Sequence, residues 1–332
     1  TVTGNNQNNR NLKIGHDATL DLNGNDEDIR QINGGGTILN TSTNDIRLDI
    51  NHSGVFTGII DETDTGTISV EKTGSNDVTF DGLNTYTGST TILSNSAIIV
   101  SNLAAGGLAS GIGASSTAAS NLLLGGDDAT PDGTGFLDLG GIRYDGWDSV
   151  ATARLFTFGN TGTGAGVLIS AEGVNLASLV FSNSGALAFG AGTADVNQTL
   201  LFSGSSQGDN VFMPQITDNP LSSSPGTLGV TSVLVAPRAN GNSVVWTLGN
   251  GNNNYTGSTT IGDGFADNND YARLVAVDGQ GLPTGSDLII NNGVFASTGT
   301  FTRKLVAFGD LTGAGDVAFN ATGINTGLAA AE

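Results

Sequence analysis

Two adjacent carboxylates are the first residues of this sequence whose types and spacing could do chemistry. Asp127 and Asp128 could act as the acid and the base that cleave a glycosidic bond. They lie in a Gly-, Pro- and Thr-rich stretch that is typical of a solvated loop. The two histidines, His16 and His52, have no serine-plus-acid pattern nearby. We therefore predict no catalytic residues and keep a carbohydrate-active enzyme as the alternative.

A second acidic cluster is the candidate metal site. Asp263, Asp267 and Asp270 lie within eight residues, together with two asparagines. Hard oxygen ligands on a flexible loop suit Ca²⁺. The spacing matches neither the twelve-residue Ca²⁺ loop nor the nonapeptide Ca²⁺ repeat, so a hydrated surface loop is the alternative. We expect no other cofactor.

Composition and charge exclude several classes of protein. The 332 residues hold 31 acids and 11 bases, a formal net charge of −20, whereas contacts to nucleic acid or anionic lipid need clustered Lys and Arg. There is no cysteine, so neither disulfides nor thiolate metal sites hold the chain together. Because no stretch approaches ~20 continuous apolar residues, we expect no direct membrane insertion of this segment.

The elements that would position any site are short strands. The chain has 51 glycines and many Ser, Thr and Asn residues, which disfavour helices. Apolar residues alternate in runs of three to six, each followed by a turn signal such as Asn-Gly or Asp-Gly. Examples of these runs are residues 18–22, 67–70, 78–80, 97–100, 167–169, 179–181, 200–202 and 244–246.

The chain is also internally repeated. The heptapeptide Tyr-Thr-Gly-Ser-Thr-Thr-Ile occurs at residues 86–92 and again at 255–261, 169 positions later. The apolar runs and turns that follow the two copies come in the same order, with loops of different length. A repeat that cannot bury its own apolar face must stack on its neighbours. We place the units at roughly residues 1–79, 80–247 and 248–332, the last one truncated, in a single continuous solenoid over 1–332.

Two all-β plans use such strands, an antiparallel sandwich or barrel and a parallel solenoid. The unequal loop lengths favour the solenoid, because its strands pair between successive coils. We therefore predict an all-β, right-handed parallel β-helix. At roughly 20 to 25 residues per coil it would have about 13 to 16 coils and a length of about 60 to 75 Å. Val, Ile, Leu and Phe would point inward, and Thr, Ser and Asn would stack outside or at corners.

Residues 66–92 resemble the autotransporter-associated β-strand repeat. That repeat has a Lys-x-Gly turn, here Lys72 to Gly74, a short strand, the sequence Asn-Thr-Tyr-Thr-Gly-Gly-Thr-Thr and another strand. Ser89 and Ser258 stand where the family has its second Gly, and the second copy lacks the Lys-x-Gly turn. The motif positions, which we interpret as structural, are Asn84, Tyr86, Thr87, Gly88, Thr90, Asn253, Tyr255, Thr256, Gly257 and Thr259.

The equal repeat positions of Tyr86 and Tyr255 favour a structural role, with the ring covering a corner and the hydroxyl reaching solvent. Stacking of sugars on these rings is the alternative.

The resemblance implies a passenger-type region of a large bacterial protein, secreted or anchored to the outer membrane. We expect a structural and adhesive extracellular segment that presents loops, and not an enzyme. A self-assembling filament or surface-layer subunit is a variant of this hypothesis. The expected partners are other copies of the chain or adjoining solenoid segments stacked end to end, and surface polysaccharide or a host cell surface, but no nucleic acid.

Overall fold

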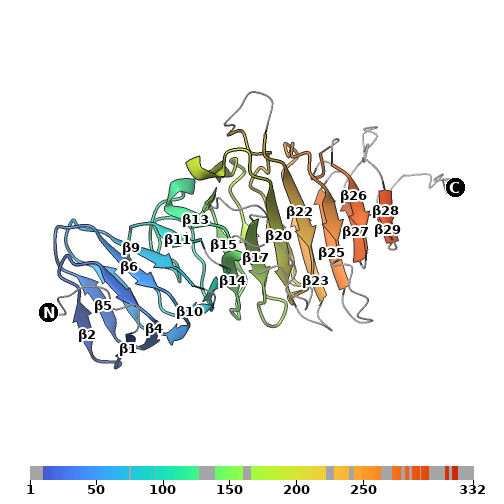
Figure 1. Ribbon diagram of the computed structural model, residues 1–332. Helices are drawn as coiled ribbons and strands as arrows, with labels where there is room; N and C mark the ends of the chain where they lie inside the picture. Colours follow the sequence, from blue (N-terminus) through green and yellow to red (C-terminus); the bar gives the residue numbers. More distant parts are fainter. Residues whose placement is uncertain are drawn as a thin grey trace.

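The protein is a parallel β-solenoid (Figure 1). The computed structural model describes residues 10–74, 76–93, 95–126, 139–159, 166–221, 228–238, 243–262, 271–277, 281–283, 286–291, 293–298, 311–313 and 316–320. Within them the only helical turns are two 3₁₀ turns, η1 (Ala119–Asn121) and η2 (Ala191–Thr193). No helix in these ranges is long and apolar enough to cross a membrane.

The largest sheet has twelve strands and runs along the whole described solenoid. Its strands follow one another in chain order, so neighbours in space are always separated by one turn of the chain (Figure 1). They are β1 (Asn11–Ile14), β4 (Gln31–Gly34), β7 (Gly54–Phe56), β10 (Val78–Phe80), β12 (Ala97–Val100), β14 (Gly140–Tyr144), β17 (Gly166–Ala171), β20 (Gln198–Gly204), β22 (Thr231–Val235), β24 (Thr259–Ile261), β26 (Leu288–Ile290) and β28 (Leu311–Gly313).

Three further sheets make the other faces. A seven-stranded sheet comprises β3 (Glu27–Ile29), β6 (Ile46–Ile50), β9 (Ile68–Lys72), β11 (Thr90–Ile92), β13 (Leu122–Leu124), β16 (Thr157–Phe158) and β19 (Ala188–Phe189). A second seven-stranded sheet comprises β15 (Val150–Thr152), β18 (Leu179–Phe181), β21 (Asn210–Phe212), β23 (Ser243–Leu248), β25 (Tyr271–Val277), β27 (Gly293–Thr298) and β29 (Asp316–Asn320). A three-stranded sheet comprises β2 (Thr19–Asp21), β5 (Thr37–Asn40) and β8 (Ile59–Glu62).

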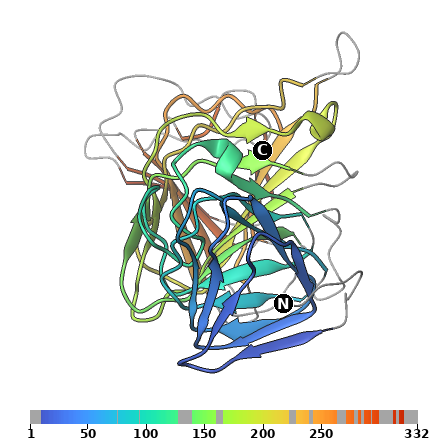
Figure 2. The same cartoon turned by 90° about the vertical axis from the view of Figure 1, so that its left-hand side faces the viewer.

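Every pairing between two of these strands is parallel, which confirms the predicted parallel β-helix. Viewed from its N-terminal end, the coil encloses a common interior, with strands on three sides (Figure 2). The right-handed sense of the coil stays a prediction, as do the repeat units at 1–79, 80–247 and 248–332.

The coils are fewer and longer than the sequence led us to expect. One coil takes 20 residues between Leu12 and Ile32, but 44 between Ile98 and Ile142. Over the described residues the largest sheet therefore has twelve strands, whereas about 13 to 16 coils were expected for the whole chain. Its eleven steps span about 53 Å at about 4.8 Å each. The predicted coil length of roughly 20 to 25 residues was too short, because the sequence alone does not show which residues belong to long turns and which to strands.

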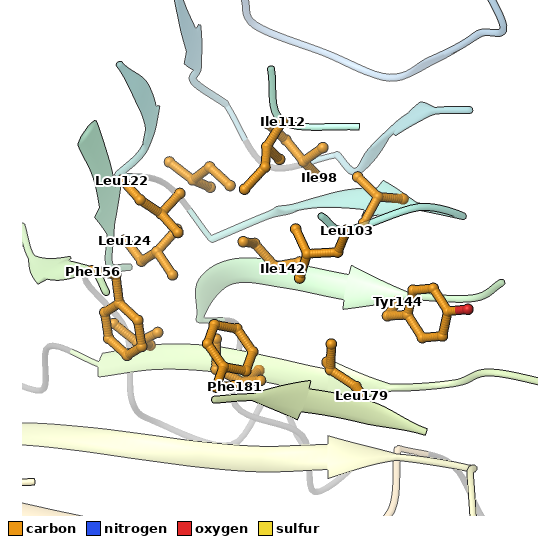
Figure 3. Packing of buried hydrophobic residues seen from close by; sticks show 14 of the residues in the cluster. Ile98, Leu103, Ile112, Leu122, Leu124, Ile142, Tyr144, Phe156, Leu179 and Phe181 are labelled. Atoms are coloured by element: carbon orange, nitrogen blue, oxygen red, sulfur yellow. The ribbon is translucent and has the colours of Figure 1, made fainter. Parts of the chain in front are cut away.

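Apolar side chains form continuous rows inside the coil (Figure 3). Alternation along each strand produces them: in β6, Ile46, Leu48 and Ile50 are buried, whereas Arg47 and Asp49 between them are only partly so. Where the coil widens, aromatic rings fill the interior. The ring pairs with centroids 4.8 to 6.5 Å apart are Phe156–Phe158, Phe156–Phe181, Phe156–Phe212, Phe158–Phe189, Phe181–Phe212, Phe202–Phe212 and Phe202–Trp246.

Candidate functional site: the repeat corners

The sequence-predicted acidic sites cannot be placed by the structure. Asp263, Asp267 and Asp270, the candidate Ca²⁺ ligands, lie outside the described residues, and so do Asp127 and Asp128. Among the residues that are described, no group of three or more His, Cys, Asp or Glu side chains could hold a metal ion.

The two histidines lie beside small polar neighbours. The Nδ1 atom of His16 lies 3.0 Å from a carboxylate oxygen of Asp17, and that of His52 lies 3.0 Å from the hydroxyl of Ser53. Each of these contacts joins residues adjacent in sequence, at the surface or half-buried, and neither links a serine, a histidine and an acid.

The repeat motif lies within the described residues, and its asparagine joins three successive coils. Asn84 is completely buried. Its Oδ1 accepts a hydrogen bond from the backbone N–H of Ile60 in the preceding coil, at 2.9 Å. Its Nδ2 donates to the carbonyl of Gly111 in the following coil, also at 2.9 Å. Ile60 belongs to β8, and the next coil has no strand at this place, so the amide side chain replaces the missing strand partner.

The second copy repeats this arrangement. Asn253 accepts a hydrogen bond from the N–H of Ile216 at 2.8 Å and donates to the carbonyl of Gly281 at 2.8 Å. It too is buried. We expected asparagines to stack outside the coil or at its corners. The structure places them at corners and bonded along the axis, but inside, because only a buried amide can reach the main chain of both neighbouring coils.

The motif tyrosines lie in the core, so the expectation of a solvent-facing hydroxyl is wrong. Tyr86 and Tyr255 are both completely buried. The hydroxyl of Tyr86 bonds the hydroxyl of Thr90 at 2.8 Å, and that of Tyr255 bonds Thr259 at 2.7 Å. Burial raises the pKa of both phenols far above the ordinary value. Each threonine follows its tyrosine by four residues, which lets the threonine hydroxyl meet the tyrosine hydroxyl. Rings that are completely buried in this way cannot stack on sugars.

The motif threonines are held by a carboxylate of the preceding coil. Glu62 accepts hydrogen bonds from the backbone N–H of Thr87, at 2.9 Å, and from its hydroxyl. Asp218 accepts the same two bonds from Thr256, at 3.0 and 2.7 Å. We call this arrangement a carboxylate staple. The sequence contained the threonines, but nothing in it marked the acids, which lie 25 and 38 residues earlier.

The motif glycines allow the coils to approach closely. A Cβ atom at Gly88 would lie 2.2 Å from the carbonyl oxygen of Ile68, and one at Gly257 would lie 2.3 Å from that of Thr231. Both distances are far below a van der Waals contact, and the obstructing atoms are backbone. Any side chain at these positions would therefore push two coils apart.

The two copies of the motif lie on different faces of the solenoid. The strand after the first motif, β11, pairs with β9 and β13 in a seven-stranded sheet. The strand after the second, β24, pairs with β22 and β26 in the twelve-stranded sheet. The strands that precede the two motifs also belong to different sheets. β10 lies in the largest sheet, and β23 lies in the other seven-stranded sheet. The motif therefore specifies a corner and not a particular face.

Carboxylate staples also occur outside the motif. Asp21 accepts a hydrogen bond from the hydroxyl of Thr41 at 2.7 Å, and Asp45 accepts bonds from the N–H and the hydroxyl of Thr67 at 2.8 and 2.9 Å. These bonds lower the pKa of both aspartates. Several acids of the chain thus serve as hydrogen-bond acceptors between successive coils.

A lysine in the apolar interior is one residue whose role the sequence did not reveal. Lys72 pairs with Ile50 and Ile92 in the ladder and is completely buried. Its ammonium group donates to the carbonyls of Thr73 and Gly74, and so closes the Lys-x-Gly turn. Burial lowers its pKa to about 8. The sequence did contain a signal for its burial, because the alternation along β9 places the fifth residue, Lys72, on the inward side.

A buried arginine was also missed. Arg154 is only 1% exposed. Its guanidinium donates to the hydroxyl of Ser115 at 2.7 Å and to the carbonyls of Gly113 and Ala104 at 2.8 and 3.3 Å. It therefore anchors the long turn after β12 to the coil formed by β14 to β16. No local pattern could have identified it, because its partners lie 39 to 50 residues earlier.

A network of ion pairs lies over the outer side of the largest sheet. Arg143 of β14 binds both carboxylate oxygens of Glu172, at 2.8 and 2.7 Å, and also contacts Asp77. Arg238 lies 3.3 Å from Glu172. Burial alone would raise the pKa of Glu172. The pKa is nevertheless lowered, because Arg143 and Arg238 stabilise the ionised carboxylate. The network ties together segments that are 66 and more residues apart.

The fold and corners define this chain as a parallel β-solenoid built on buried asparagine corners. Comparison with known proteins relates it to a bacterial adhesin. It is 32% identical, over an alignment of 329 positions, to the adhesin BmaC autotransporter of Brucella suis biovar 1 (strain 1330). The alignment covers 85% of this chain but only 9% of that relative. No family model and no solved structure matches the chain. The chain is therefore related to a segment of an autotransporter adhesin.

Removal of the corner asparagine should destabilise the coil. Asn84→Ala leaves the N–H of Ile60 and the carbonyl of Gly111 buried without partners, which should lower the free energy of unfolding by about 2–4 kcal/mol. Urea unfolding followed by circular dichroism measures the loss, and hydrogen exchange at the amide of Ile60 locates it. Asn84→Asp, which keeps the acceptor, should protect that amide better than Asn84→Ala does.

Asn76→Ala is the matched control, because Asn76 is exposed at a bend, and it should change stability by less than about 0.5 kcal/mol. Equal stability of Asn84→Ala and this control would refute the role assigned to the corner.

The buried lysine should make stability depend on alkaline pH. The folded pKa of Lys72 is about 8, against an ordinary value of 10.5. Between these values the unfolded chain binds more protons than the folded chain, so folding becomes more favourable as pH rises. The urea midpoint of the wild type, relative to that of Lys72→Met, should therefore increase from pH 7.5 to pH 10. Lys13→Met, at an exposed position of β1, serves as the control and should show no such trend.

Proposed function

We propose that this chain is an extracellular structural and adhesive segment of a larger bacterial surface protein. It would hold its turns and loops away from the cell, secreted or anchored at the outer membrane. The observation that carries this proposal is the unbroken parallel ladder of twelve strands, whose corners are closed by buried side chains. Such a ladder gives a rigid, extended body without disulfides. The relation to an autotransporter adhesin supports the same assignment.

We further propose membership of the autotransporter-associated β-strand repeat family. The support is that both copies of the motif form the same corner. Asn, Tyr, Thr and Gly make equivalent contacts in each copy, although the two corners lie on different faces. A chance recurrence of seven letters would not preserve contacts to residues in other coils.

A non-enzymatic role is part of this proposal. The relative is an adhesin by name. The strongly shifted groups of the motif, Tyr86 and Tyr255, are sealed in the core and cannot reach a substrate. The partners we propose are therefore surfaces, either a polysaccharide coat or a host cell.

If the chain is an adhesive rod, it should behave as an elongated particle that binds cells. Small-angle X-ray scattering should give a maximum dimension well above that of a compact protein of 33.4 kDa. Fluorescently labelled protein should adhere saturably to cultured cells or to polysaccharide-coated beads. A compact particle would contradict the rod. A rod that adheres to no surface tested would contradict adhesion and leave only the structural role.

One observation favours end-to-end association as a second candidate. At the N-terminal end of the described solenoid, β1, β2 and β3 are the last strands of their sheets. Between them a cavity of about 490 Å³ is lined by Leu12, Leu20, Leu22 and Ile29 together with polar residues. We propose that a coil of a second copy stacks there in parallel, because the edge strands of the described sheets lie beside apolar side chains that favour pairing.

Association of this kind should depend on concentration and on the lining of the cavity. Light scattering after size exclusion should show the mass rising with concentration, and Leu20→Lys should abolish the rise by placing a charge in the junction. Leu83→Lys, at an exposed turn, is the control and should associate like the wild type. A mass that stays at that of one chain at all concentrations would rule out this candidate.

A further inference from the structure

We propose that an exposed ridge in the middle of the solenoid binds a basic polypeptide segment, through stacking of Lys or Arg side chains on Trp147. We define the ridge as Trp147, Val174 and Leu176 together with the carboxylates of Asp145 and Asp148. The exposed fractions of the three apolar residues are 73%, 37% and 65%. The inference rests on the proposed adhesive function and names the chemical class of its partner.

The ridge residues come from two adjacent coils. Trp147 lies in the turn between β14 and β15, and Val174 and Leu176 lie in the turn between β17 and β18. The N–H of Val174 donates to the carbonyl of Gly146 at 3.0 Å, and the N–H of Val150 donates to the carbonyl of Ser178 at 2.8 Å. The two turns therefore run side by side, which places Trp147 and the two exposed apolar residues on adjacent turns of the same surface.

The backbone holds this apolar surface outward at a cost. Asn175 and Leu176 have φ angles of 53° and 65°, in the left-handed region. That region is uncommon for leucine, because its Cβ then crowds the following carbonyl group. The cost gains no burial, since Leu176 remains exposed. The next coil packs closely against this turn, since a Cβ at Gly208 would lie 2.2 Å from the carbonyl oxygen of Leu176.

The charge around the ridge selects a cationic partner. Asp145 and Asp148 flank Trp147 in sequence and are exposed, and Asp209 is exposed in the following coil. The nearby guanidinium groups point elsewhere, that of Arg143 to Asp77 and Glu172 and that of Arg154 to the interior.

The field at Asp145 is unfavourable to its own charge. Although the residue is exposed overall, partial desolvation of its carboxyl group, followed by the negative charges of Asp81 and Glu172, raises the pKa of Asp145 in spite of the opposing charge of Arg143. A bound cation would relieve this repulsion, whereas a neutral ligand would not. The chain as a whole carries a net charge of −20, which would steer basic partners toward it.

A Lys or Arg side chain matches each part of the ridge. Its charged head is attracted both by the face of an indole and by carboxylates beside the ring. Its aliphatic stem packs on apolar side chains, as Val174 and Leu176 offer. A neutral sugar would use the indole but would leave the carboxylates and their charge without a function. We therefore favour a basic polypeptide over a saccharide.

The test is a titration of the intact chain with an octapeptide of alternating glycine and arginine, followed by calorimetry and by tryptophan emission. The second tryptophan, Trp246, is completely buried, so a change in acrylamide quenching reports on Trp147. We expect Trp147→Ala to weaken binding about tenfold. Asp145→Asn with Asp148→Asn should weaken binding and reduce its dependence on salt. Leu176→Asn, which suits the left-handed backbone, should weaken it without affecting the fold.

Matched controls keep the result specific. Leu83→Ala and Asp17→Asn alter an exposed leucine and an exposed aspartate elsewhere and should leave the affinity unchanged. The same octapeptide with citrulline in place of arginine should not bind. Equal binding of the citrulline peptide, no effect of Trp147→Ala, or protection of Trp147 by maltohexaose in place of the basic peptide would each overturn the proposal.

The same variant separates this inference from the proposed function. If the wild type adheres to cells and Trp147→Ala adheres equally well, the ridge is not the contact but the adhesive role stands. If the wild type adheres to nothing while the basic peptide still binds at Trp147, adhesion fails and the ridge remains a peptide-binding site.

Discussion

Pairing of the main chain between successive coils is the constraint on which this structure depends. A buried N–H or carbonyl without a partner costs roughly 1–3 kcal/mol. Strands satisfy the requirement on the flat faces, but each coil must also turn. Where the main chain at a corner lacks a strand partner, Asn84 and Asn253 reach in both directions and supply an acceptor to one neighbouring coil and a donor to the other. The tyrosine and the glycine of the motif serve the same corner. The tyrosine ring fills the interior there, and the glycine lets the two neighbouring coils approach closely.

The acidic character of the chain has a structural use as well as an electrostatic one. A carboxylate accepts two bonds at once from a threonine in the next coil, as Glu62 and Asp218 do, and needs no cation to be useful. The solenoid can therefore keep a large negative charge while its acids still stabilise the stack. The charge that remains at the surface is then available to select partners by their sign. This is consistent with a rod whose binding surfaces are its turns.

Local sequence determines the structure of a corner, whereas the lengths of the preceding coils determine the face on which that corner lies. The heptapeptide produces the same corner wherever it occurs, because its contacts depend on spacings of two to four residues and on the main chain of whichever coils lie beside it. The face on which the corner falls depends instead on how many residues the preceding coils used. These vary from 20 to 44, so identical letters end up in different sheets. The long segment between β12 and β14 lengthens its coil without interrupting the ladder, since both strands still pair in register.

The sequence by itself determined the all-β class, the parallel stacking and the identity of the corner residues, because period-two alternation and an exact repeat are local signals. It did not determine the number of coils or the burial of Tyr86, or the roles of Lys72, Arg154 and Glu62. Those depend on contacts between residues about 20 to 50 positions apart, and the register that joins them is decided only when the coils stack. The same applies to the ridge at Trp147, whose two halves lie in different coils and become one surface only in the folded chain.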